Sequence, residues 1–149
     1  MRALFLSQTV DAVEAALAAA GASGRVAVID WPKLGARLAE RGREVLAIAG
    51  KPRSLRRVAG ARLYGDIVRL PLADGALGAV VAPGVGERDD WEAVMGELSR
   101  ALGGGGTLVM VDRSPATELT RRALCGGLVE VEQRVAGRTV VTSGRVVAL

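Results

Sequence analysis

The sequence predicts an α/β fold of three layers, with a mostly parallel sheet between helices and an antiparallel hairpin at its end. The first observation is the stretch 25–50, RVAVIDWPKLGARLAERGREVLAIAG, which reads as strand, turn, helix, turn and strand. Two parallel strands need such a crossover helix. The other observations are the alternation of apolar runs with helical patterns further along, and the alternating residues of segment 128–149.

Each element is predicted from its hydrophobic period and from the residues that end it. Apolar residues at helical spacing indicate helices, short apolar runs indicate buried strands, and glycine or proline separates them. In chain order we predict helix 9–20 capped by Ser7 or Thr9, strand 26–29, a helix ending at Gly42, strand 45–48, helix 54–59, strand 62–64, strand 79–82, a helix capped by Asp89 or Asp90 and ending near Leu102, strand 107–111, a helix starting at Ser114–Pro115 with Ser114 as its cap, and the hairpin 128–149.

Composition narrows the classes of function. The 149 residues are 50% hydrophobic but only 3% aromatic, so few rings are available to stack on bases and a nucleic-acid partner is not expected. The net charge of +4 comes almost entirely from arginine and permits anionic partners. A chain without histidine and with one cysteine, Cys125, has neither an intramolecular disulfide nor the ligands of a zinc site, so we expect no metal.

The first residues predict neither a signal peptide nor a membrane span, because the acids Asp11 and Glu14 interrupt the apolar run. We therefore expect a cytoplasmic protein without a membrane partner.

Three stretches resemble the class I S-adenosylmethionine-dependent methyltransferases. YGDIVRLPLADGALGAVVA (64–82) resembles that family's segment of an acid, LP-x-x-DG and the fourth strand. WEAVMGELSRALGGGGTLVMVD (91–112) resembles its helix, glycine-rich turn and fifth strand, and GLVEVEQRVAGRTVV (127–141) resembles its terminal hairpin. The resemblance implies a seven-stranded sheet with the last strand inserted antiparallel.

The same resemblance implies one methyltransferase-like domain over residues 1–149. It would comprise an N-terminal helix (1–24), a Rossmann-like core (25–112), and a C-terminal helix and β-hairpin (113–149).

The cofactor pattern of the family is matched only in part. Asp30 occupies the place of the acid after the first strand, but Trp31–Pro32 replaces the glycine turn whose backbone approaches the cofactor. Ala49 and Gly50 stand where an acid would bind the ribose, with Lys51 beyond them. If the cleft is competent, the resemblance implies that its cofactor contacts are Asp30, Trp31, Gly35, Asp66, Ile67 and Pro83.

Several of these residues also have structural interpretations. Asp30 is better explained as a cap of the following helix, whereas Asp66 fits a turn former and a cofactor contact about equally well. Trp31 either fills the vacated cleft, which we favour, or stands exposed as an anchor for a partner. The acids Glu87, Asp89 and Asp90 fit the negative charge that stabilises a helix N-terminus.

The sequence thus favours a degenerate methyltransferase-like domain, a pseudoenzyme without a competent S-adenosylmethionine site. It would serve as a protein-interaction or structural module, bound to an unknown protein partner or as a homodimer, with no catalytic residues and no cofactor. One alternative is a small S-adenosylmethionine-dependent methyltransferase with an atypical cofactor loop. A second is a phosphate or nucleic-acid binder that uses the basic segment of Lys51, Arg53, Arg56, Arg57 and Arg62.

Overall fold

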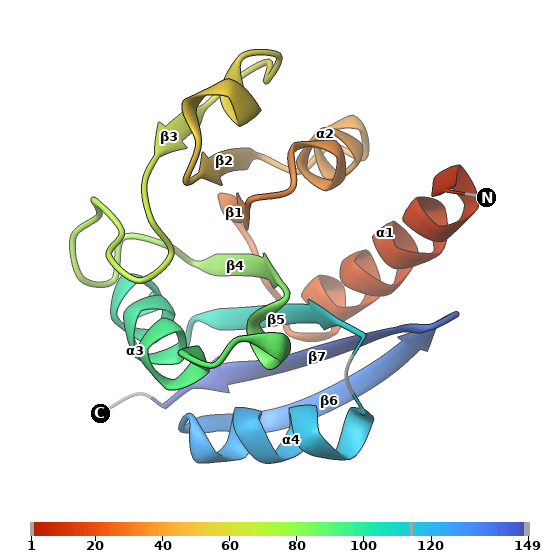
Figure 1. Cartoon of the computed structure of the whole chain (residues 1–149), viewed down its shortest axis with the longest axis vertical. Helices are drawn as coiled ribbons and strands as arrows, with labels where there is room; N and C mark the ends of the chain where they lie inside the picture. The colour runs from red at the N-terminus through yellow and green to blue at the C-terminus, as the bar shows by residue number, and fades with distance from the viewer. Residues whose placement is uncertain (1, 114, 148–149) are drawn as a thin grey trace.

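The computed structural model describes the backbone of residues 2–113 and 115–147, and their side chains from Leu6 onward. Seven strands form one sheet in the order β3-β2-β1-β4-β5-β7-β6 (Figure 1). The strands are β1 (Val26–Ile29), β2 (Val45–Ala49), β3 (Arg62–Tyr64), β4 (Ala79–Pro83), β5 (Thr107–Asp112), β6 (Leu128–Ala136) and β7 (Thr139–Val146). The helices are α1 (Arg2–Ala19), α2 (Pro32–Glu40), α3 (Trp91–Leu102) and α4 (Ala116–Cys125), with 3-10 turns η1 (Pro52–Leu55) and η2 (Val85–Glu87).

Strand pairing confirms the predicted topology. Strands β1 to β5 pair in parallel, whereas β7 lies antiparallel between β5 and β6. The C-terminal hairpin therefore forms one edge of the sheet, with β6 outermost and α4 beside it (Figure 1). Strand order places the carboxyl ends of β1, β4 and β5 next to one another, which is where ligands bind in open α/β sheets.

Alternate strand residues face two separate cores, which explains why the inner strands are apolar on both faces. Val26 and Val28 of β1 pack on one face beneath α1 and α2, and Ala27 and Ile29 pack on the other face. That second face is covered by α3, part of α4 and the 67–77 segment. The three-layer arrangement that the sequence predicts is therefore present.

Two predicted helices differ from the observed ones. Helix α1 begins at Arg2 rather than near Thr9, which is buried within it, because the preceding residues continue the helix without a break. Segment 54–59 does not form the predicted helix and a 3-10 turn occupies Pro52–Leu55 instead. In this segment Leu55 and Val58 alone pack against β2, which is too little apolar surface to stabilise a longer helix.

Among the predicted caps that the structure describes, Asp90 does occupy the N-cap position of α3, but it makes no capping hydrogen bond. In the described chain, α3 follows Asp90 without a side-chain cap bond, since that carboxylate pairs with Arg88 at 2.7 Å. Pro115 precedes α4 at its cap position rather than within its first turn. The proposed cap Ser114 lies outside the described residues.

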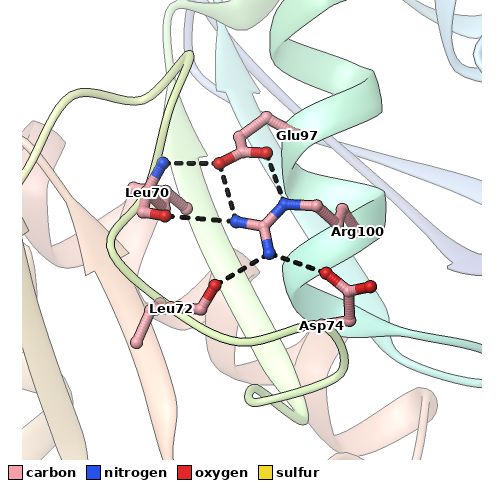
Figure 2. A network of polar contacts seen from close by, with 5 residues as sticks. All are labelled: Leu70, Leu72, Asp74, Glu97 and Arg100. Atoms are coloured by element: carbon pink, nitrogen blue, oxygen red, sulfur yellow. Dashed lines mark hydrogen bonds and ion pairs between the residues drawn. The ribbon is translucent and has the colours of Figure 1, made fainter.

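A network around Arg100 fastens the irregular β3–β4 connection to α3 (Figure 2). The guanidinium donates to the carbonyl oxygens of Leu70 (3.1 Å) and Leu72 (2.7 Å), and to the carboxylates of Asp74 (2.9 Å) and Glu97 (2.6 Å). Glu97 in turn accepts the amide of Leu70. One helix side chain therefore satisfies main-chain oxygens that a regular crossover element would satisfy internally.

Among the described helices, none combines the length and the apolar character that crossing a membrane requires.

Candidate functional site

A cavity of about 340 Å³ opens where the carboxyl ends of β1, β4 and β5 meet the start of β7. Three acids and one base line it together with an indole ring and small apolar groups. The lining residues are Asp30, Trp31, Pro83, Gly84, Glu87, Val111, Asp112, Arg113 and Thr139. Its place at the strand ends agrees with the general position of ligand sites in α/β sheets.

Asp30 connects the ends of β1 and β2 instead of capping α2. Its Oδ1 accepts the amide of Gly50 at 3.0 Å. Helix α2 instead follows Trp31, without a side-chain cap bond from any described residue. Asp30 itself has a φ of 51°, in the left-handed region that aspartate tolerates better than most side chains. The predicted capping role of Asp30 is therefore wrong.

Two further carboxylates are held at the cavity by main-chain amides. Glu87 of η2 accepts the amide of Arg113 at 3.0 Å, and Asp112 at the end of β5 accepts the amide of Gly86 at 2.8 Å through Oδ1. Asp112 is only 3% exposed, and its Oδ2 has no hydrogen-bond partner among the described residues. A buried oxygen without a donor is uncommon in folded proteins and calls for an explanation.

Burial controls the protonation of Asp112. Desolvation raises the pKa of its carboxyl to about 6, and the negative charge of Glu87 adds to the rise. The Gly86 amide and the Arg122 guanidinium act in the opposite direction because both favour the charged form. The Asp112 carboxyl in this cavity therefore changes its protonation state within about one pH unit of neutral pH.

Hydrogen bonds from Arg122 of α4 hold the loop after β4 in place. The Arg122 guanidinium donates to the carbonyl oxygens of Gly86 (2.6 Å) and Arg88 (3.2 Å), pairs with Glu118 at 2.9 Å, and lies 5.2 Å from the Trp91 ring centre. A Cβ at Gly86 would lie 2.0 Å from Leu119 Cδ2 and 3.2 Å from the Asp112 carboxyl carbon. Glycine at this position allows the main chain to approach Asp112 closely enough to donate to it.

The six predicted cofactor contacts do not come together at one place. Asp30, Trp31 and Pro83 line the cavity, where the half-buried Trp31 also packs against the core beneath α1 and α2. Gly35 lies in α2 against Val45 and Val28, and Ile67 is buried in the opposite core.

Asp66, the remaining predicted contact, sits in a surface turn. Its Oδ1 accepts the Val68 amide at 3.1 Å, which is the bond of a turn-forming aspartate. The alternative interpretation of Asp66 as a turn residue therefore has direct geometric support. Its predicted contact with a cofactor remains a prediction.

The basic segment lies beyond the end of β2. Lys51, Arg53, Arg56 and Arg57 are exposed around η1. Arg62 is partly committed to structure, since its guanidinium donates to the Leu55 carbonyl at 3.0 Å. The proposed role of the segment in phosphate or nucleic-acid binding stays a prediction.

A second, larger groove of about 830 Å³ runs between α2, β2 and the segment that follows η1. The β2–β3 connection beside this groove contains a 3-10 turn in place of a full helix. Small apolar residues such as Ala36, Ala39 and Val58 line the groove, with Lys33 and Arg57 among its charged residues.

The sequence patterns do not single out Asp112 as a site residue, since the predicted strand 107–111 ends just before it. They explain Glu87 only as negative charge at a helix N-terminus, and Glu87 does lie in the first turn of η2. The usable signal was that both acids follow neighbouring parallel strands, whose carboxyl ends meet at one edge of the sheet. Their actual convergence depends on the turn at Gly84, whose φ of 74° requires the left-handed region.

Comparison of sequences and of structures gives different results. No protein-family model matches the sequence, and no curated protein is similar to it in sequence. Solved structures match almost the whole chain. An S-adenosylmethionine-dependent methyltransferase from Thermotoga maritima is 20% identical, with a TM-score of 0.72 over 95% of this chain and 88% of its own.

Two further structures agree with this likeness. A protein from Methanococcus maripaludis, assigned as an S-adenosylmethionine-dependent methyltransferase, has a TM-score of 0.76 and 13% identity over 99% of this chain and 89% of its own. A complex of the Haloferax volcanii Trm112 methyltransferase activator with an assigned methyltransferase matches with a TM-score of 0.70 and 16% identity, over 93% of this chain and 89% of that chain. Together with the strand order, these matches establish that the chain has the Rossmann-like fold of the class I S-adenosylmethionine-dependent methyltransferases.

Proposed function

We propose that this protein is a methyltransferase-fold module that binds a protein partner and does not bind S-adenosylmethionine. The observation that carries the proposal is the short turn between β1 and α2. In this turn the Asp30 carboxylate already accepts a hydrogen bond from the Gly50 amide after β2, and only Trp31 separates Asp30 from the helix that starts at Pro32. A turn this short supplies few free amides for a nucleotide cofactor, and proline removes one more donor.

The charge at the end of β2 supports the same proposal. A ribose is usually held by a carboxylate at the end of this strand in dinucleotide-binding sheets. Here Gly50 and the exposed Lys51 follow β2, so the hydrogen-bond acceptor for the ribose hydroxyls is missing from that position.

For the partner we propose the groove between α2, β2 and η1. Alanine side chains in its lining leave room for a partner's apolar residues. The lining cations Arg25, Lys33 and Arg57 outnumber the acids Glu40 and Glu44, and with the neighbouring Lys51 and Arg53 this excess of positive charge favours an acidic segment. An amphipathic helix with acids along its rim has this chemistry, and it would occupy the place where a crossover helix is absent. The complex of an assigned methyltransferase of this fold with an activator is a precedent for partnership.

Calorimetric titration with S-adenosylmethionine and with S-adenosylhomocysteine tests the absence of a cofactor site. We expect no heat of binding for either compound up to about 1 mM, the weak end of cofactor affinities. Micromolar binding of either compound would overturn the proposal. In that case Asp30→Asn and Asp66→Asn would show which of the predicted contacts holds the cofactor, because both substitutions preserve side-chain shape.

A second candidate is a methyltransferase with an atypical cofactor loop. It is favoured by the cavity itself, which brings Asp30, Trp31 and Pro83 together with Asp112, a carboxylate suited to accept a proton near neutral pH. Methyl transfer from labelled S-adenosylmethionine to a set of small acceptors, lost in Asp112→Asn, would support this candidate. Absence of cofactor binding in the calorimeter excludes it.

A further inference from the structure

Strand β6 has one edge that no described strand covers. It is the last strand of the sheet, and within the described residues it pairs only with β7 (Figure 1). Two of the exposed large hydrophobic residues, Val129 and Val135, lie on this strand, and Val135 is 73% exposed. A free strand edge with exposed apolar residues is able to pair with another chain, which is why natural proteins usually protect such edges.

The hydrogen bonds of β7 show which groups of β6 point outward. The Val146 amide donates to the Gly106 carbonyl, so Val146 faces β5, and every second residue before it faces the same way. The odd-numbered residues of β7 therefore face β6, where their partners in segment 132–136 are even-numbered. The amide and carbonyl groups of Gln133 and Val135 consequently point away from the sheet, where a further strand would meet them.

The two charged residues beside Gln133 have opposite signs. Glu132 and Arg134 both face α1, since each lines a hollow next to that helix, and their side chains are 60% and 29% exposed. Within the chain they are only loosely paired, at 3.4 Å. If a second β6 lay antiparallel about a two-fold axis at Gln133, Glu132 of each copy would lie directly opposite Arg134 of the other.

The charges also select this register over its neighbour. An axis at Glu132 would place the two Glu132 carboxylates opposite each other, which is unfavourable. An axis at Gln133 pairs the outward groups of Gln133 with those of its own copy, and it leaves positions 132 and 134 as the pairs whose side chains approach most closely. Charges of a single sign would protect the edge from its own copy, whereas Glu132 and Arg134 are complementary to themselves.

Helix α4 leaves room for the second strand. Its end adjoins the start of β6, where the Gly127 amide donates to the Leu124 carbonyl, and its beginning lies at Gln133, whose side chain donates to the Ala116 carbonyl at 2.8 Å. The part of β6 from Gln133 to Ala136 therefore extends beyond α4. An axis at Gln133 places the two α4 helices on opposite sides of the axis, so they do not occupy the same space.

We propose that β6 pairs antiparallel with β6 of a second copy of this chain, about a two-fold axis at Gln133, so that the two sheets become one. Val135 of each copy then lies opposite Val131 of the other and is no longer exposed. This interface is at the other end of the sheet from the groove between α2, β2 and η1. It does not rest on the proposed function, and a monomeric protein would leave that proposal untouched.

Sedimentation velocity of the whole chain tests the proposal at about 100 µM, well above a micromolar dissociation constant. We expect a species of twice the chain mass of 15.4 kDa. Glu132→Arg and Arg134→Glu should each be monomeric, because like charges then meet across the axis. An equimolar mixture of these two variants should dimerise, since every arginine again faces a glutamate. Glu92→Arg makes the same change of charge on the exposed side of α3 and should stay dimeric.

A further variant covers the case in which Arg134→Glu does not fold. Val135→Pro removes an amide that points away from β7, a substitution that edge strands accept, and it should abolish the dimer while circular dichroism shows an unchanged fold. Hydrogen exchange should show protection of the Gln133 and Val135 amides only at dimeric concentrations. The proposal is overturned by a monomeric wild-type protein, by a dimer that survives Glu132→Arg or Val135→Pro, or by folded charge variants whose mixture stays monomeric.

Discussion

Replacement of Asp112 by asparagine should change how the stability of this protein depends on pH. The substitution keeps the shape of the side chain and its acceptor for the Gly86 amide, but it removes the ionisation. Desolvation, assisted by the charge of Glu87, raises the pKa of Asp112 from its ordinary value of 3.8 to about 6 in the folded protein. The unfolded chain is expected to keep the ordinary value.

The sign of the effect follows from this difference. Between pH 3.8 and about 6 the folded protein holds a proton on Asp112 that the unfolded chain has already released. The stability that this group contributes is therefore fully present below pH 3.8, and it is lost as the pH rises through about 6. At 1.36 kcal/mol for each pH unit, the loss amounts to about 3 kcal/mol.

Urea unfolding of both proteins between about pH 4 and pH 8 measures this loss. The free energy of unfolding of the wild-type protein should fall by about 2 to 3 kcal/mol relative to Asp112→Asn over that range. Glu118→Gln is the control with the opposite trend, because ion pairs with Arg121 and Arg122 lower the pKa of Glu118 and make its contribution greatest at high pH. A difference between wild type and Asp112→Asn that stays constant with pH, or that grows in the other direction, would refute the account of Asp112.

Three further predictions concern the frame and the groove. Arg100→Met should lower the urea midpoint more than Arg121→Met, because Arg100 holds the β3–β4 connection whereas Arg121 pairs with Glu118 on the surface of α4; equal midpoints would contradict this. Gly96→Ala should stabilise the protein by up to about 1 kcal/mol, since an added Cβ in the exposed middle of α3 meets no other atom within 4 Å, and thermal unfolding measures it. Ala39→Glu should abolish capture of a protein partner in pull-down experiments while Ala18→Glu on α1 retains it; retention by both would remove the groove as the partner surface.

The fold could be predicted because the sequence patterns that specify its strands and helices lie within short segments of the chain. The segment 25–50 contains two strands that are apolar on both faces and a helix whose buried residues, Leu34 and Leu38, are one turn apart. Such patterns specify element type independently of distant contacts. The start of α1 is harder to predict, because an alanine-rich helix has no clear boundary in the sequence. Segment 54–59 is harder to predict for another reason: it has helical propensity but too little apolar surface to pack as a helix.

The site could be predicted only in part, for a different reason. Asp30, Trp31 and Pro83 follow strands that the sequence identifies, and the structure brings these three residues to one cavity. The state of Asp112 depends on its burial, on the turn after β4 and on the amide of Gly86, which are properties of packing between elements. Residue type and spacing describe none of these properties. In the sequence Asp112 therefore looks like any acidic residue at the end of a strand.

The interior position of β7 bears on the order in which the molecule can assemble. Residues 139–146 lie between β5 and β6 and pair with both, so β6 has no place in the sheet until the segment that follows it has been synthesised. During synthesis the parallel strands β1 to β5 can pair first. The edge of β5 then stays unpaired until β7, about 30 residues further along the chain, has been made. Truncation within β7 would therefore remove both β7 and β6 from the sheet. The sheet is completed only when β7 has been synthesised and has paired with β5.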